Sequence, residues 1–164
     1  FDEPATKDIT AILAETSLTS ENQTITEGIS DPGIPRNIRI VANNTDTAGD
    51  VVINGTDIGD NAISEILTLN GDTEVVGDNA FKTVASIELP AETNTDSDAV
   101  KVGTDNKLGL PYKLELNTVL KAYRDGVLEG IAPTVATDAI NIENNTVLLD
   151  SALNGTDVDV YLIV

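Results

Sequence analysis

Short runs in which apolar and polar residues alternate, separated by turn residues, dominate this sequence. The clearest runs are residues 36–42, 81–89, 112–117 and 158–164. Their apolar positions are Ile38, Ile40 and Ala42; Phe81, Ala85, Ile87 and Leu89; Tyr112, Leu114 and Leu116; and Val158, Val160, Leu162 and Val164. A period of two residues is typical of half-buried strands, because successive side chains of a strand point to opposite faces. The sequence therefore predicts an all-β fold.

Turn signals such as "GDN", "NGD", "GTDNKLG" and "RDG" recur between these runs. Short strands at this spacing predict an antiparallel β-sandwich or a barrel-like domain. Asp125-Gly126 fits a two-residue type I′ hairpin turn. In residues 51–71 we place the turn at Gly59-Asp60-Asn61, which pairs residues 50–58 with residues 62–70 as strands of ordinary length.

The residues around this turn allow two further expectations. Gly55 falls inside a strand, where glycine often marks a bulge. Asp57 and Asp60 fall at the loop end of the hairpin, and we expect both carboxylates to face solvent.

The domain organisation follows from punctuation at "SDPGIP", residues 30–35. We predict an extended N-terminal arm with one or two short strands at 1–34. A β-rich domain follows at 35–164, with a sub-boundary near residue 104. The chain begins at Phe1 and contains no Met, so we expect that a leading segment was removed or lies outside this sequence. No run reaches the roughly 20 apolar residues of a membrane-spanning helix.

The charge of the chain limits its partners. It carries 28 acidic and 9 basic residues, for a net charge of −19. Nucleic acid and anionic membrane surfaces are not expected to bind, because both need a basic surface. Two interpretations of the acidity stay open. One is an ordinary solvated surface, and the other is a high-salt environment that screens self-repulsion over about 3 Å at 1 M.

Catalytic residues are scarce in the sequence. It has no His and no Cys, which are the commonest general base and the strongest nucleophile. A pair of carboxylates, as in glycosidases, remains an alternative. Carbohydrate sites commonly use aromatic platforms, and this chain has only five aromatic residues. We therefore predict a non-enzymatic protein with no cofactor and no small-molecule substrate.

Acidic loops raise the question of calcium. An EF-hand loop needs Gly at its sixth position, and a loop starting at Asp57 has Ala62 there. A loop starting at Asn94 fails in the same way, although a different calcium site at Asp96 and Asp98 remains an alternative. We predict no metal site.

Two further patterns concern the surface. The acceptor pattern Asn-x-Thr for N-glycosylation occurs at Asn22, Asn43, Asn54, Asn144 and Asn154. Turn-rich composition explains these sequons as well as surface sugar does. The run "KLGLPYKL", residues 107–114, holds Leu108, Leu110, Pro111 and Tyr112. It is either an edge strand that enters the core or a contact surface for another subunit, where a Tyr anchor would be typical.

The order of several segments carries a resemblance. "PRNIRIVANN", "GDVVINGTDIGDNAISEILTLNG", "NAFKTVASIELP", "GTDNKLGLPYKL" and "ALNGTDVDVYLIV" follow one another over residues 35–164. This succession resembles the capsid decoration (head auxiliary) proteins of tailed double-stranded DNA viruses. "NAFKTV" and "KLGLPYKL" are its most specific parts.

The resemblance implies a β-rich protein on the outside of an icosahedral capsid. Its partners would be the major capsid protein and other copies of itself, often as a homotrimer at local three-fold positions. Residues 1–34 would reach a neighbouring subunit. The family has no catalytic residues. The strong acidity departs from more neutral members and would fit a virus of a halophilic host. Another virion component (tail tube, head fibre or turret base), a cell-surface adhesin-like β-domain and a calcium-dependent carbohydrate-binding module are the alternatives.

Overall fold

The computed structural model describes residues 1–93 and 97–164. These residues form thirteen strands and one short 3₁₀ helix, and every strand pairing is antiparallel, which confirms the all-β fold. The strands are β1 (Asp8–Ser17), β2 (Gln23–Ile25), β3 (Arg36–Ala42), β4 (Asp50–Thr56), β5 (Ala62–Thr68), β6 (Val75–Phe81), β7 (Thr83–Leu89), β8 (Ala99–Gly109), β9 (Val119–Arg124), β10 (Val127–Leu128), β11 (Thr134–Ala136), β12 (Thr146–Leu148) and β13 (Val158–Leu162), and the helix is η1 (Ile142–Asn144). Among them is no helix of the length and apolarity that crossing a membrane requires.

Two sheets form a sandwich over most of the chain. One has the order β11-β12-β8-β3-β6, with β1 also paired to β8, and the other has the order β2-β7-β4-β5. Ile38, Val102, Ile53 and Ile87, from both sheets, lie in one fully buried cluster. Phe81 is its single aromatic member, so branched aliphatic side chains make this core.

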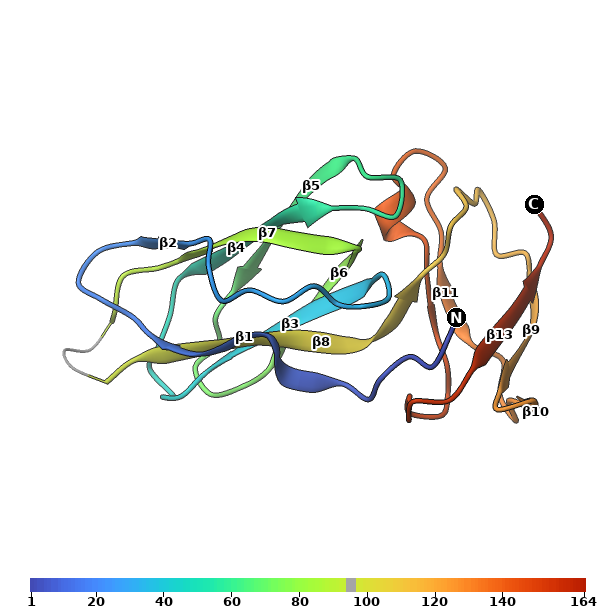
Figure 1. Cartoon of the computed structure of the whole chain (residues 1–164), viewed down its shortest axis with the longest axis horizontal. Coiled ribbons are helices and arrows are strands. Elements are labelled where there is room, and N and C mark those ends of the chain that lie inside the picture. The colour runs from blue at the N-terminus through green and yellow to red at the C-terminus, as the bar shows by residue number, and fades with distance from the viewer. Residues whose placement is uncertain (94–96) are drawn as a thin grey trace.

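A smaller unit lies at the opposite end of the molecule from β2 (Figure 1). Its three-stranded sheet has the order β10-β9-β13. A second core joins this sheet to the end of β8 and to β12, through Leu108, Ala122, Val147 and Val158. We call residues 110–164, which include β11 and β12 at the end of the larger sheet, the C-terminal unit, and use sandwich below for the rest of the chain.

Strand β8 runs through both cores. Val100 and Val102 lie in the first core and Leu108 lies in the second. One edge of β8 pairs with β3, while its other edge pairs first with β1 and then with β12. Gly103 lies where β1 approaches most closely, because a Cβ there would be 2.0 Å from the carbonyl oxygen of Asp8. The "GTDNKLG" run, interpreted above as a turn, belongs to β8. Residue 104, near which we expected a sub-boundary, also lies inside this strand.

The hairpin expected in residues 50–70 is confirmed. Strand β4 pairs with β5 along its whole length, with Asp50 opposite Thr68 at one end and Thr56 opposite Ala62 at the other. A Cβ on Gly55 would be 1.9 Å from the carbonyl oxygen of Thr83. The pairing of β4 with β7 also shifts at this glycine, which confirms the expected irregularity.

The shift explains one wrong expectation. Asn54 pairs with Ser86 and Gly55 pairs with Val84, so Ala85 is the extra residue of a bulge. Ala85 is exposed and Val84 is buried, whereas strict alternation predicted the reverse.

Two other expectations differ from the structure. Residues 112–117 form no strand, and Leu116 is 74% exposed. The extended N-terminal arm is not confirmed, because β1 and β2 belong to the two sheets of the sandwich and Ile12 and Leu13 are buried in its core.

Candidate interaction surface

A groove of about 370 Å³ opens between β13 and the segment that follows β8. Its lining is mostly apolar and consists of Phe1, Pro35, Ile58, Leu110, Pro111, Tyr112, Val158, Asp159, Val160 and Leu162. The local sequence explains why residues 110–112 form one wall of this groove. The Leu110 amide donates to the carbonyl oxygen of Asn145 at 2.8 Å, which anchors Leu110 in the core. Pro111 has no N–H and ends the strand pairing, so Tyr112 turns outward.

The four residues expected to contact another subunit therefore divide into two pairs. Leu108 and Leu110 are 0% and 1% exposed, and both belong to the second core of this chain. Pro111 is exposed and Tyr112 is 44% exposed, and both line the groove. Burial removes the two leucines from any contact surface, which leaves Pro111 and Tyr112 as candidates.

Exposed apolar side chains concentrate in the C-terminal unit. Ile66 and Val76 are the large exposed hydrophobic residues that the structure describes in the sandwich. The C-terminal unit has ten: Tyr112, Leu116, Leu120, Val127, Leu128, Ile131, Ile140, Tyr161, Ile163 and Val164. Scattered single residues of this kind are normal on a protein surface, whereas a concentration on one part of it is typical of an interaction site.

The tyrosines have the same distribution. All three tyrosines of the chain lie in the C-terminal unit. Tyr123 on β9 and Tyr161 on β13 are in edge-to-face contact, with ring centroids 5.6 Å apart. Tyr161 remains 55% exposed, and Leu128 pairs with Tyr123 on the next strand. Tyrosines of this kind are enriched in the central parts of protein–protein interfaces.

The carboxylates of the β4–β5 hairpin correct another expectation. Asp57 is only 2% exposed, and its Oδ1 accepts the amides of Gly59 at 2.7 Å and Asn61 at 2.9 Å. It stabilises the turn from inside because a carboxylate satisfies the free amides of the loop. Asp60 is exposed as expected and forms an ion pair of 2.6 Å with Lys82.

The sequons differ in how available their side-chain nitrogen is. The Nδ2 atoms of Asn43, Asn54 and Asn144 donate to Ser97, Ser86 and Asp138, respectively. Asn22 and Asn154 are exposed and use Oδ1 in their described side-chain hydrogen bonds, with Ala91 and Thr156. In the described side-chain hydrogen bonds, these two are therefore the sequons that use Oδ1 rather than Nδ2.

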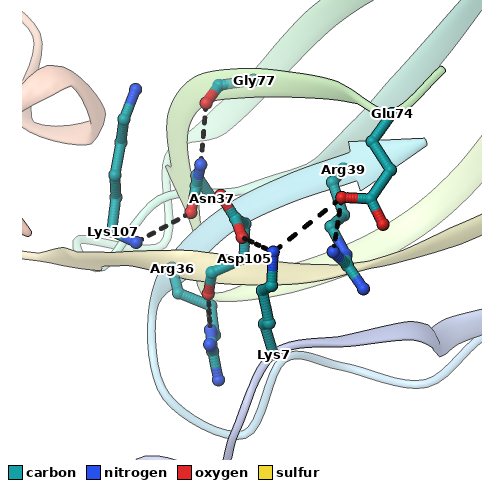
Figure 2. Close-up of polar contacts among 8 residues, drawn as sticks. All are labelled: Lys7, Arg36, Asn37, Arg39, Glu74, Gly77, Asp105 and Lys107. Carbon is teal, nitrogen blue, oxygen red and sulfur yellow. Dashed lines mark hydrogen bonds and ion pairs between the residues drawn. The ribbon is translucent and has the colours of Figure 1, made fainter. Parts of the chain in front are cut away.

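Two buried arginines of β3 form the main charged cluster of the sandwich (Figure 2). Arg36 is 1% exposed. Its Nε donates to the carbonyl oxygen of Asp105 at 2.6 Å and its Nη1 donates to that of Ala5 at 2.9 Å. Burial lowers the pKa of Arg36 to about 10, although the Asp105 carboxylate opposes this shift. The cluster ties the segment before β1 to the sheet.

Arg39 completes the cluster. It is 5% exposed, and its Nη1 lies 2.8 Å from the Glu74 Oε2 atom. The Lys7 Nζ atom lies 3.9 Å from both Glu74 and Asp105 (Figure 2). Alternation predicted that Arg39 lies on the face opposite the core, and the structure shows that this second face is covered as well. The arrangement is an ion network in which the arginine is buried while Lys7 and Glu74 remain partly exposed.

A polar hollow beside β5 and β6 contains Glu65, Asp78 and Asp138. Burial raises the pKa of Glu65, although the amides of Asp78 and Asn79 donate to its Oε1 atom and oppose the shift. Asn144 and the amides of Asn141 and Ile140 lower the pKa of Asp138. Over residues 1–93 and 97–164, no set of three or more acidic side chains is arranged to hold a metal ion. Asp96, one of the two alternative calcium ligands, lies outside the described residues.

Asn145 is the residue that the sequence reasoning missed. It is 0% exposed. Its Oδ1 accepts the amides of Leu114 and Asp138, both at 2.9 Å, and its Nδ2 donates to the carbonyl oxygens of Asp138 and Asn141, both at 2.8 Å. In the sequence it is one of two adjacent asparagines in a turn signal, and nothing there distinguishes it from Asn144.

Comparisons of this chain with protein-family models, with curated proteins and with solved structures found no match. The candidate site therefore rests on geometry alone.

Proposed function

We propose that this protein is a virion structural protein that decorates and stabilises the outer surface of an icosahedral tailed-virus capsid. It has no enzymatic role, and it attaches through the C-terminal unit to the major capsid protein and to other copies of itself. The resemblance over residues 35–164 suggests the virion and the capsid exterior as its location. The expected homotrimer and halophilic host remain predictions.

The observation that carries this proposal is the uneven surface. The C-terminal unit exposes ten large hydrophobic side chains, and the sandwich exposes two among the described residues. Burial of apolar surface drives most protein association, at about 25 cal/mol per Å². The whole chain is acidic, and a protein that concentrates its exposed large hydrophobic side chains at one end is suited to dock by that end. Many copies on one particle add avidity, so each contact can be modest.

Two exposed residues allow a matched test of the attachment surface. Leu120 on β9 and Ile66 on β5 are both 63% exposed. We expect Leu120→Glu to weaken rebinding to stripped heads about tenfold or more, because it places a charge in the apolar contact. Ile66→Glu should rebind like the wild type, because it lies on the sandwich.

The location itself is tested by imaging purified particles with this protein labelled. The proposal requires density on the outside of the head, and the symmetry of that density tests the trimer. Density confined to tails, or heads that lack the protein, would refute the capsid role. Equal loss of rebinding by both variants would refute the assignment of the attachment surface.

A further inference from the structure

The segment before β1, residues 1–7, runs from the C-terminal unit to the sandwich (Figure 1), and we call it the strap. At the C-terminal unit, the Val158 amide donates to the carbonyl oxygen of Phe1 at 3.0 Å. The Gly155 amide donates to the carbonyl oxygen of Pro4 at 3.1 Å. These bonds fasten the strap to the first residue of β13 and to the loop before it.

The other end of the strap is fastened to the sandwich by cations. The carbonyl oxygen of Ala5 accepts Nη1 of Arg36 at 2.9 Å, and Arg36 is 1% exposed. The Lys7 Nζ atom lies 3.9 Å from both Glu74 and Asp105 (Figure 2). Because salt screens buried groups much less than exposed ones, the bond to Arg36 holds this end at low and high ionic strength.

The end at the C-terminal unit is acidic. Its exposed acidic residues are Asp2, Glu3, Asp157 and Asp159. Phe1 and Val158 exchange two backbone hydrogen bonds, so Asp2 and Asp157 form the next opposed pair, with their side chains on the same face. Like charges directly opposite each other destabilise a pairing. Over residues 1–93 and 97–164, none of the four carboxylates forms an ion pair with a Lys or Arg.

Backbone strain is located at the same end. Glu3 has a φ of 43°, in the left-handed region that residues other than glycine rarely adopt. Its amide donates to the Asp157 Oδ1 atom at 3.3 Å, a long hydrogen bond between exposed groups. A residue held in this region costs conformational energy, which is released when the contact opens. Repulsion and strain therefore both favour opening at the acidic end, while the sandwich end stays anchored.

We propose that the strap is a conformational device controlled by ionic strength. At about 1 M salt the Debye length is about 3 Å, so the carboxylates are screened and the strap lies closed on the start of β13. At about 0.1 M it is about 10 Å, and the strap opens from its acidic end as far as Ala5. Phe1 lines the apolar groove, so opening removes part of its wall. Salt thus sets access to the groove, whether or not the protein belongs to a virion.

Amide exchange of the purified protein, below its melting temperature, tests this device. The amides of Gly155 and Val158 report on the strap, because each donates to a carbonyl oxygen of the strap. The Asp125 amide is the internal control, because it donates to the carbonyl oxygen of Asp157 within the C-terminal unit. We expect Gly155 and Val158 to exchange about tenfold faster at about 0.1 M than at about 1 M salt, and Asp125 to be unchanged.

Two variants separate the strap from the charge of the whole chain. Asp157→Asn removes a carboxylate but keeps the Oδ1 atom that accepts the Glu3 amide, so it should abolish most of the acceleration at low salt. Asp150→Asn is the matched control, because it removes the same charge from an exposed residue of the C-terminal unit outside the strap contacts. It should exchange like the wild type.

Three outcomes would overturn the proposal. The first is equal exchange of Gly155 and Val158 at both salt concentrations in the wild type. The second is equal rescue by the two variants, which would assign the effect to net charge. The third is equal acceleration of Asp125, which would mean that the whole unit opens. The measurement needs no particles, so the device can fail while the capsid role stands, and the reverse.

Discussion

Replacing Asn145 is the sharpest test of how the C-terminal unit is held together. Its side chain makes four hydrogen bonds of 2.8–2.9 Å, to the amides of Leu114 and Asp138 and to the carbonyl oxygens of Asp138 and Asn141. Leu114 lies in the second core. Asn145 lies directly before β12 and thus fixes two loops to the start of that strand, and with them one wall of the groove.

The expected cost follows from these bonds. A buried hydrogen bond contributes about 1 kcal/mol net, so Asn145→Ala should lower the free energy of unfolding by about 4 kcal/mol. Domains of this size are stable by about 5–15 kcal/mol, so the loss is a large share of the total. Asn145→Asp keeps the shape of the side chain but replaces the donor Nδ2 with an oxygen, which then faces the carbonyl oxygens of Asp138 and Asn141. Its cost should be at least as large, which separates hydrogen bonding from packing.

Tyrosine fluorescence provides a local assay. The chain has no Trp, and its three tyrosines lie in the C-terminal unit, so their emission during urea unfolding reports that unit. We expect the tyrosine-detected midpoint to fall in both variants. Asn154→Ala is the control, since Asn154 is exposed and its Oδ1 accepts only the Thr156 hydroxyl in the described bonds. Asn145→Asp within about 1 kcal/mol of the wild type would refute the reasoning.

Three further predictions concern the sandwich and the whole chain. Gly103→Ala should cost about 1–3 kcal/mol of stability in urea unfolding, because its Cβ would clash with β1 backbone, whereas Gly130→Ala, with no atom within 4 Å, should be neutral; equal effects would contradict the close approach. Burial raises the pKa of Glu65, so the cost of ionising Glu65 begins as the pH rises through the unfolded pKa and is complete above the folded pKa. It is absent only where both folded and unfolded forms are protonated, at about pH 3. Glu65→Gln should therefore raise the melting temperature at pH 7 and leave it unchanged at about pH 3, and an equal gain at both values would disprove this cause. Lowering salt from about 1 M to about 0.1 M should lower the melting temperature, because the Debye length grows from about 3 to about 10 Å around a chain of charge −19; unchanged melting would remove the high-salt interpretation.

Local patterns predicted several strands in which apolar and polar residues alternate in the sequence. Residues 36–42 alternate clearly and form β3 over the same residues, and Asp125 and Gly126 both have the positive φ of a type I′ turn, 52° and 70°. Alternation failed at Ala85, because a bulge adds one residue and reverses the faces beyond it. It also failed to show that Arg39 is buried, because the acidic partner, Glu74, lies 35 residues away in the chain.

The longest strand was misread for a related reason. Gly103, Thr104, Asp105 and Asn106 have the composition of a turn, yet they lie in β8. The glycine is needed because the backbone of β1 lies too close there for a Cβ atom. The carbonyl oxygen of Asp105 accepts a hydrogen bond from the Arg36 side chain. Both partners are distant in sequence, so no local window contains the reason for the strand.

The candidate surface was predicted only in part. The apolar run at 107–114 supplied four candidates for a subunit contact, of which Pro111 and Tyr112 are exposed and Leu108 and Leu110 are buried. Leu116, Leu120, Ile131 and Ile140 are exposed although they are apolar, because the small sheet leaves too little core to cover them. Exposure of this kind depends on the size of the unit and has no signature in the sequence.

The continuous strand β8 also determines how the molecule would respond to a mechanical load. A pull on the C-terminal unit travels along the backbone of β8 into its ladders with β3 and β1. The strands are loaded lengthwise, in shear, so many hydrogen bonds must yield together rather than one after another. A protein anchored by its C-terminal unit to a shell under internal pressure would thus resist tearing at the junction between its two cores.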